Sequence, residues 1–95
     1  MSKRYYQGET MRQNVEVTNV KGTLIDPDTI VITIIDPEET VKTDAQNMTK
    51  DSTGKYHYDY LLADDALVGD WKTEIEAVKG FTAIEQDEFT VMEAL

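Results

Sequence analysis

The sequence predicts an all-β protein, a single antiparallel sandwich of two sheets with about seven strands. Thr, Val and Ile number 27 of the 95 residues, against 11 for Ala and Leu, and β-branched side chains favour pleated strands over helices. Segments in which apolar and polar residues alternate recur along the chain, separated by turn signals at intervals of roughly 8–12 residues. A small closed barrel is the alternative architecture. Residues 1–95 are expected to form one domain.

The first half of the chain contains three expected strands. Residues 10–18 alternate in polarity, and Gln13 is the polar interruption of their apolar face. Residues 5–7 precede them as a short edge segment. Residues 29–35 are apolar on both faces, which indicates a central strand or one whose outer face is covered. Residues 40–43 are expected to form a short strand around Val41.

The second half begins with a polar stretch at residues 44–53, in which Met48 is the expected inward anchor. Tyr56, Tyr58 and Tyr60 then alternate with polar residues and should share one face of a strand.

Two more strands are expected toward the end of the chain. Residues 71–78 alternate again, and a turn at residues 79–80 leads into a last strand at residues 81–91. In that last strand the alternation slips between Glu85 and Glu88, which predicts a β-bulge.

Five short segments carry a resemblance to a known type of domain. Residues 6–11, YQGETM, resemble the Y-x-x-G-E-T-V entry to a first long strand, and residues 51–56, DSTGKY, resemble a D-x-x-G-x-Y approach to a later strand. Residues 26–37, 67–72 and 89–91 are similar to the second strand with its turn, a P-L-G-x-W/Y-x element and a closing F-x-V. In this order the segments resemble immunoglobulin-like sandwiches of the bacterial and macroglobulin kind.

The resemblance implies an immunoglobulin-like β-sandwich that serves as a building block without catalysis. It implies that Tyr56 is a tyrosine-corner residue whose hydroxyl bonds to nearby backbone, and we expect Trp71 and Phe89 to be structural. The chain departs from the pattern at Gln7, where proline is common, and at Val68, where a small residue or proline is frequent. It has no Cys, which excludes the disulfide of antibody domains and the thioester of full macroglobulins.

Composition excludes several classes of function. The formal net charge of −10 argues against a nucleic-acid partner, because phosphates would be repelled. No segment approaches the length of a membrane span, and no apolar segment of a signal peptide follows the basic start, so neither membrane insertion nor a leader is expected. Without Cys, with one His and with no nucleophile motif around Ser2 or Ser52, no catalytic residues are assigned.

Carboxylates are the plentiful chemical groups. Asp26, Asp28 and Asp36 flank turns that would offer oxygen ligands if they met at one end of the sandwich, which makes them weak candidates for calcium. No cofactor is otherwise expected. His57 lies on the strand face opposite the tyrosines and is expected to be a surface residue.

These observations predict a non-enzymatic structural or interaction module that binds other proteins, with self-association left open. The leading hypothesis is a small virion subunit, a head decoration or tail-associated protein of a tailed bacterial or archaeal virus. The alternatives are an immunoglobulin-like module of a bacterial or archaeal cell-surface or secreted adhesin and, third, a carbohydrate-binding module. Edge strands are ready pairing sites, so Tyr5, Tyr6 and Val41 are the expected partner contacts.

Overall fold

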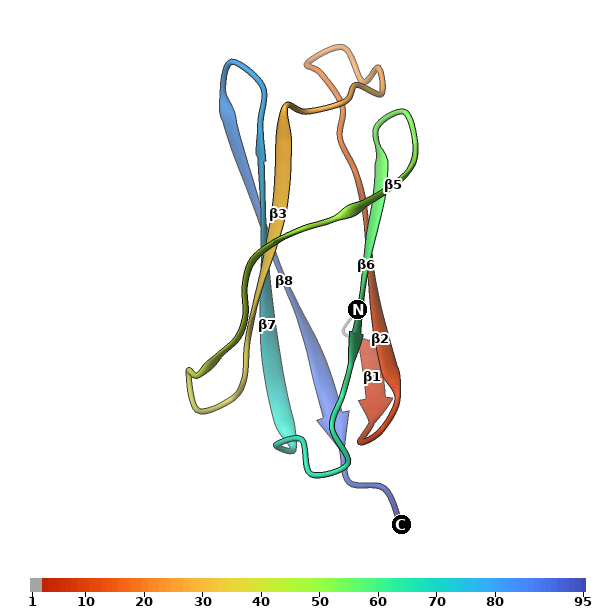
Figure 1. The fold of residues 1–95 in the computed structure, drawn as a ribbon, viewed down its shortest axis with the longest axis vertical. Coiled ribbons are helices and arrows are strands. Elements are labelled where there is room, and N and C mark those ends of the chain that lie inside the picture. Colours follow the sequence, from red (N-terminus) through yellow and green to blue (C-terminus); the bar gives the residue numbers. More distant parts are fainter. Residues whose placement is uncertain (1–2) are drawn as a thin grey trace.

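The computed structural model describes residues 3–95, which form eight strands in two facing sheets (Figure 1). The strands are β1 (Lys3–Tyr6), β2 (Thr10–Glu16), β3 (Thr29–Ile35), β4 (Val41–Asn47), β5 (Thr49–Ser52), β6 (Lys55–Leu61), β7 (Gly69–Val78) and β8 (Thr82–Met92). One sheet has the order β1-β8-β7-β3-β4 and the other β2-β6-β5. Neighbouring strands are antiparallel except β1 and β8, which run parallel. The predicted all-β sandwich is confirmed, with eight strands in place of about seven.

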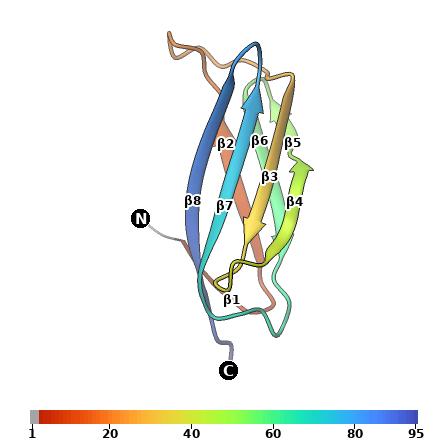
Figure 2. The ribbon, with the colours of Figure 1, turned by 90° about the vertical axis from the view of Figure 1, so that its left-hand side faces the viewer.

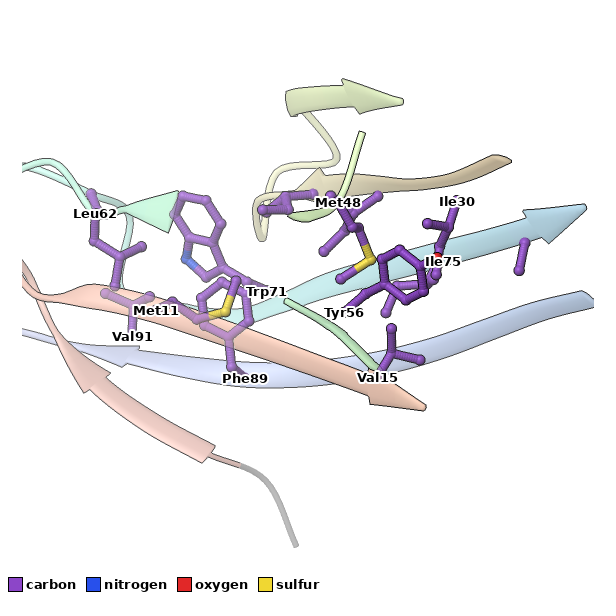
Figure 3. Packing of buried hydrophobic residues seen from close by; sticks show 14 residues of the cluster. Met11, Val15, Ile30, Met48, Tyr56, Leu62, Trp71, Ile75, Phe89 and Val91 are labelled. Carbon is purple, nitrogen blue, oxygen red and sulfur yellow. The ribbon is translucent and has the colours of Figure 1, made fainter. Parts of the chain in front are cut away.

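Alternate side chains of the strands fill the space between the two sheets (Figure 3). Met11 and Val15 of β2 face Trp71 and Ile75 of β7 across this core, which also contains Phe89 of β8. Each buried aliphatic or aromatic side chain contributes about 1.5–3 kcal/mol to folding. The alternation read from the sequence is therefore the pattern that holds the sheets together.

β3 lies in the interior of its sheet, between β7 and β4. Ile30, Ile32 and Ile34 are buried on its inner face, and Val31 and Ile35 are half-buried on its outer face. β3 is therefore a central strand, which is one of the two explanations expected for its two apolar faces.

The segment from residue 41 to residue 52 differs from the expectation. β4 continues to Asn47, and after one residue β5 starts in the other sheet. The residue between them is Met48, which is buried and donates its backbone N–H to the carbonyl of Ile30 at 3.1 Å. The chain thus crosses from one sheet to the other at Met48, and polar residues on both sides of the crossing form strands because their backbones pair.

The bulge predicted in the last strand is wrong. The register of β7 and β8 runs without interruption from Gly69 opposite Val91 to Val78 opposite Thr82. The alternation slips because residues 82–88 of β8 are exposed on both faces, so a carboxylate on the inner face meets water instead of the core.

Within residues 3–95, no helix has the length and apolarity needed to cross a membrane.

Candidate interaction surfaces

Asp26 is the centre of a polar cluster at the end of the sandwich where β3 begins. Its carboxylate accepts hydrogen bonds from Lys50 Nζ at 2.8 Å, from the Gly54 backbone N–H at 2.9 Å and from the Tyr56 hydroxyl at 3.2 Å. The bond from Lys50, followed by that from Gly54, lowers the pKa of Asp26. Gly54 has φ +73, and a Cβ on it would lie 2.9 Å from the carbonyl oxygen of Val17, so only glycine fits this turn.

Tyr56 therefore has a structural role, but a different one from that implied by the resemblance. A tyrosine corner would bond the hydroxyl to backbone, whereas the Tyr56 hydroxyl donates to a side-chain carboxylate, that of Asp26. The reason lies in the tertiary structure: the loop between β2 and β3 brings Asp26, 30 residues away in sequence, within 3.2 Å of the Tyr56 hydroxyl. Burial, together with the negative charge of Asp26, raises the pKa of Tyr56 above its ordinary value.

The predicted calcium cluster does not form. Asp26 and Asp28 precede β3, and Asp36 follows it, so a strand of seven residues separates them. At about 3.3 Å per residue that strand holds the two groups at opposite ends of the sandwich. The Asp36 carboxylate instead accepts the backbone N–H groups of Glu38 and Thr40, both at 2.9 Å, which stabilises the turn after β3.

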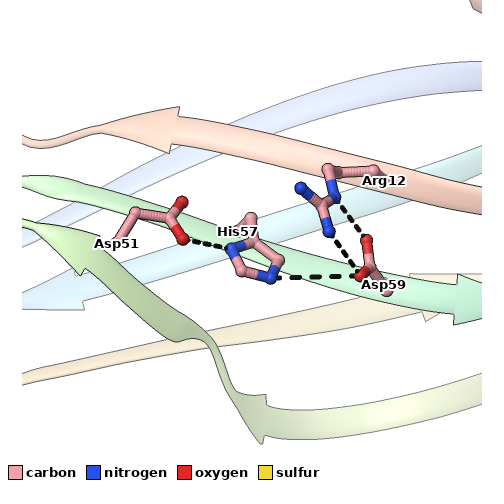
Figure 4. A network of polar contacts seen from close by, with 4 residues as sticks. All are labelled: Arg12, Asp51, His57 and Asp59. Carbon is pink, nitrogen blue, oxygen red and sulfur yellow. Dashed lines mark hydrogen bonds and ion pairs between the residues drawn. The ribbon is translucent and has the colours of Figure 1, made fainter.

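His57 lies on the outer face of the three-stranded sheet, as expected, within a row of charges (Figure 4). Its Nδ1 is 2.7 Å from Asp51 Oδ1, and its Nε2 is 3.9 Å from Asp59 Oδ2. Arg12, directly opposite Asp59 in the register, donates to both carboxylate oxygens at 2.7 and 2.8 Å. This bidentate bond lowers the pKa of Asp59. The sequence did not reveal the row, because its members come from β2, β5 and β6.

Trp71 and Phe89 lie in the core, 1% and 2% exposed, with their rings stacked at a centroid distance of 5.6 Å. The Trp71 Nε1–H donates to the carbonyl of Leu67 at 2.8 Å, so the buried indole has its hydrogen bond. Tyr58 and Tyr60 pack against the same core. The tyrosines of β6 thus face inward and form no exposed aromatic row of the kind that a carbohydrate-binding face requires.

The three expected partner contacts lie on edge strands of the five-stranded sheet. Tyr5 and Tyr6 belong to β1 at one edge, and Val41 belongs to β4 at the other. Tyr6 and Val41 are 51% and 52% exposed, whereas Tyr5 packs edge-to-face on Phe89 at 5.9 Å. Tyr6 and Val41 are therefore available to a partner, and the ring of Tyr5 is engaged within the fold.

A further surface was not singled out by sequence reasoning. A groove of about 250 Å³ opens between the sheets beside the first residues of β8, and Phe81 and Ile84 lie at it, 56% and 57% exposed. Its signal in the sequence is the break in alternation after Ile84, which reflects the exposure of residues 82–88 and not a bulge.

Neither a family model nor a curated protein matches the sequence. Among solved structures, the chain is similar to the crystal structure of the Lin-41 filamin domain, with a TM-score of 0.70 and 16% sequence identity. The match covers 95% of this chain and 83% of that one.

The fold is immunoglobulin-like. A likeness at this level of identity shows the arrangement of strands and nothing about activity. The bacterial or macroglobulin subtype suggested by the sequence segments stays a prediction.

Proposed function

We propose that this immunoglobulin-like domain is a non-enzymatic interaction module that binds other proteins through its strand edges. The observation that carries the proposal is the exposure of large apolar side chains on strands with a free edge. Tyr6 on β1, Val41 on β4 and Ile84 on β8 are between 51% and 57% exposed. Apolar side chains beside unpaired backbone N–H and C=O groups are suited to adding a strand from another molecule.

The electrostatics of the domain favour binding over catalysis. A carboxylate acting as general acid at neutral pH needs a raised pKa, usually through burial. Within residues 3–95, the two carboxylates with shifted pKa values are Asp26 and Asp59, and cationic neighbours, Lys50 and Arg12, lower both pKa values. Such groups stay ionised and serve as fixed partners in ion pairs.

The larger assembly that we propose for this module is the virion of a tailed bacterial or archaeal virus, in which the domain would coat the head or associate with the tail. Its small size and the exposed edges of β1, β4 and the first half of β8 support a role as a subunit between neighbours. The apolar outer face of β3, with Val31 and Ile35 half-buried, offers a further contact for such a neighbour.

The first test is the solution mass of the purified chain by light scattering across concentration, with and without calcium. Oligomers independent of calcium are expected of an assembly subunit. The second test follows the chain through a density gradient of particles from its native source, where sedimentation with particles is expected. A chain that stays monomeric and never sediments with particles contradicts the virion proposal. A calcium-dependent mass would point instead to a surface module of the adhesin type.

A further inference from the structure

A loop forms the roof of the groove between the sheets. Residues 17–28 lead from β2 of one sheet to β3 of the other, at the end of the sandwich where β8 begins (Figure 1). Backbone hydrogen bonds hold this loop to both sheets. The Val17 N–H donates to the Gly54 carbonyl at 2.7 Å, and the Asp28 N–H donates to the Val78 carbonyl at 2.7 Å. The roof is therefore part of the fold before any ligand binds.

The groove is open on the side between β2 and the first half of β8. Within residues 3–95, β1 pairs only with residues 89–92 of β8 and leaves residues 82–88 with β7 as their one neighbour (Figure 2). In the facing sheet of the same part of the chain, β2 pairs only with β6. A small molecule can therefore enter between the two strand edges, beneath the roof.

The walls of the groove are apolar and come from both sheets. Val15 lines it from β2, and Ile75 and Ala77 line it from β7 (Figure 3). The roof adds Val17, Ile25 and Pro27, and the start of β8 adds Ala83 and Ile84. Phe81 lies at the opening and is 56% exposed, so apolar surface is in contact with water there. Covering such surface with an apolar ligand is favourable.

The volume of the groove limits the size of its ligand. Pockets for drug-sized molecules measure about 300–1,000 Å³, whereas a cavity of about 150 Å³ lined by Leu, Ile and Phe binds benzene. At about 250 Å³, the groove lies between these two cases and has room for one fused ring system. Phe81 at the opening favours a ring as ligand, because aromatic rings pack well in offset or edge-to-face pairs.

The charged groups at the groove favour a cation. Glu85 lies on the inner face of β8, directly opposite Ile75, and Glu16 of β2 lines the groove from the other sheet. Within residues 3–95, no cationic side chain lies within 4.0 Å of either carboxylate. Lys79 also lines the groove, but its ammonium group donates to the Asp26 carbonyl at 2.9 Å. The formal net charge of −10 adds to the attraction for cations.

We propose that the groove is a binding site for a small organic cation, an amine attached to one apolar ring system. The ring lies beneath the roof of residues 17–28, against Val15, Ile75 and Ala77, and the ammonium group lies at the opening beside Glu85. This site is a further activity of the domain, and it does not depend on the binding of proteins through strand edges.

The test uses the whole 95-residue chain and three probes that share the indole ring. Tryptamine, indole and indole-3-acetate are cationic, neutral and anionic at neutral pH. Titration with tryptamine to millimolar concentration should change the backbone amide shifts in nuclear magnetic resonance spectra along β2, the second half of β7 and the first half of β8. Tryptamine should bind roughly threefold more tightly than indole, the effect of one exposed ion pair, and indole-3-acetate should bind more weakly than indole.

A variant that fills the groove tests the location. Ala83 lines the groove from the inner face of β8, opposite Ala77, so Ala83→Phe places a ring of the protein itself in the space. This variant should bind all three probes at least tenfold more weakly. Thr82→Phe is the matched control, because it adds the same ring at an exposed position on the outer face of β8, and it should leave the three affinities unchanged. A thermal melt checks that both variants fold.

A second pair of variants tests the charge. Glu85→Gln should reduce the preference for tryptamine over indole and leave the affinity for indole unchanged. Glu88→Gln removes the same charge from the outer face of the same strand and should leave the preference unchanged. The two variants have the same net charge, so a difference between them reports the position of the carboxylate.

Three results would overturn the inference. The first is the absence of shifts with tryptamine at millimolar concentration, and the second is a set of shifts that maps away from the groove. The third is an affinity for indole-3-acetate equal to or higher than that for tryptamine, which would exclude a cation as the ligand. If Ala83→Phe does not fold, the map of shifts on the parent chain decides the location.

Discussion

Glu85 of β8 lies directly opposite Ile75 of β7, and both side chains are on the inner face of their sheet. Ile75 is 2% exposed, whereas Glu85 is exposed to solvent. The next inward pair repeats the contrast: Thr73 is buried, and Asp87, opposite it, is exposed. At these two positions the core therefore ends between β7 and β8, although it includes Phe89 and Val91 farther along β8. The inward carboxylates of residues 85 and 87 protect an edge that would otherwise be apolar.

Replacing Glu85 with valine should expose this edge to self-association. The Glu85→Val variant loses the repulsion between copies and gains an apolar side chain over the groove, so its mass by light scattering should rise with concentration more steeply than that of the parent chain. Glu85→Gln, which removes the charge without adding apolar surface, should have a smaller effect. Equal masses for all three chains at every concentration would contradict this role of Glu85.

Trp71→Ala should lower the free energy of unfolding by about 3–5 kcal/mol, because it leaves a large cavity beside Phe89 and Tyr60. That is much of the total stability of a small domain. Urea denaturation measures the change. Phe81→Ala, at a side chain 56% exposed, is the control and should cost less than about 1 kcal/mol. A well-folded Trp71→Ala variant of unchanged stability would mean that the indole does not support the core.

Thr73→Val should leave stability unchanged or raise it by up to about 1 kcal/mol. The Thr73 hydroxyl is buried and has no hydrogen-bond partner within residues 3–95, so it pays the cost of desolvation without a compensating bond. Valine has nearly the same shape and no polar atom. Urea denaturation of the parent chain and of the Thr73→Val variant measures the difference in their free energies of unfolding. A loss of more than about 1 kcal/mol would show that the hydroxyl bonds a buried water.

Acidification should remove the contribution of the Arg12–Asp59 ion pair to the free energy of unfolding. The bond from Arg12 holds the pKa of Asp59 below its unfolded value of about 3.9, so the unfolded state binds the proton first. The stabilisation is present above about pH 4 and is lost as the pH falls through the lowered pKa of the folded state.

Melting temperatures from pH 7 to pH 2 test this, with Arg12→Gln as the comparison. The difference in melting temperature between the parent chain and the variant should be largest near neutral pH and should decrease below about pH 4. It should also decrease at high salt, because both side chains are exposed. A gap that stays constant with pH would mean that the pair adds nothing through charge.

The strands could be predicted because each depends on its own residues. Apolar and polar residues alternate around Met11 and Val15 and again from Trp71 to Ala77, and this alternation predicts which side chains face the core. Three interpretations that depended on the rest of the fold are wrong. Asp36 does not meet Asp26, because a whole strand lies between them, and the slip after Ile84 is not a bulge, because the register is continuous. The Tyr56 hydroxyl bonds the Asp26 carboxylate and not the backbone.

Composition, alternation and turn residues were enough to determine an all-β sandwich, its central strand and the inward face of most strands, because side-chain periodicity and turn preference are local properties. Only the tertiary structure decided that Asp26 receives the Tyr56 hydroxyl, that Arg12, Asp59 and His57 form one row, and that β1 covers just the last four residues of β8. These relationships join residues far apart in sequence, and they depend on which strand edges meet. Whether a strand edge lacks a partner depends on the packing of the whole chain, and the alternation of apolar and polar residues along that strand indicates it only weakly.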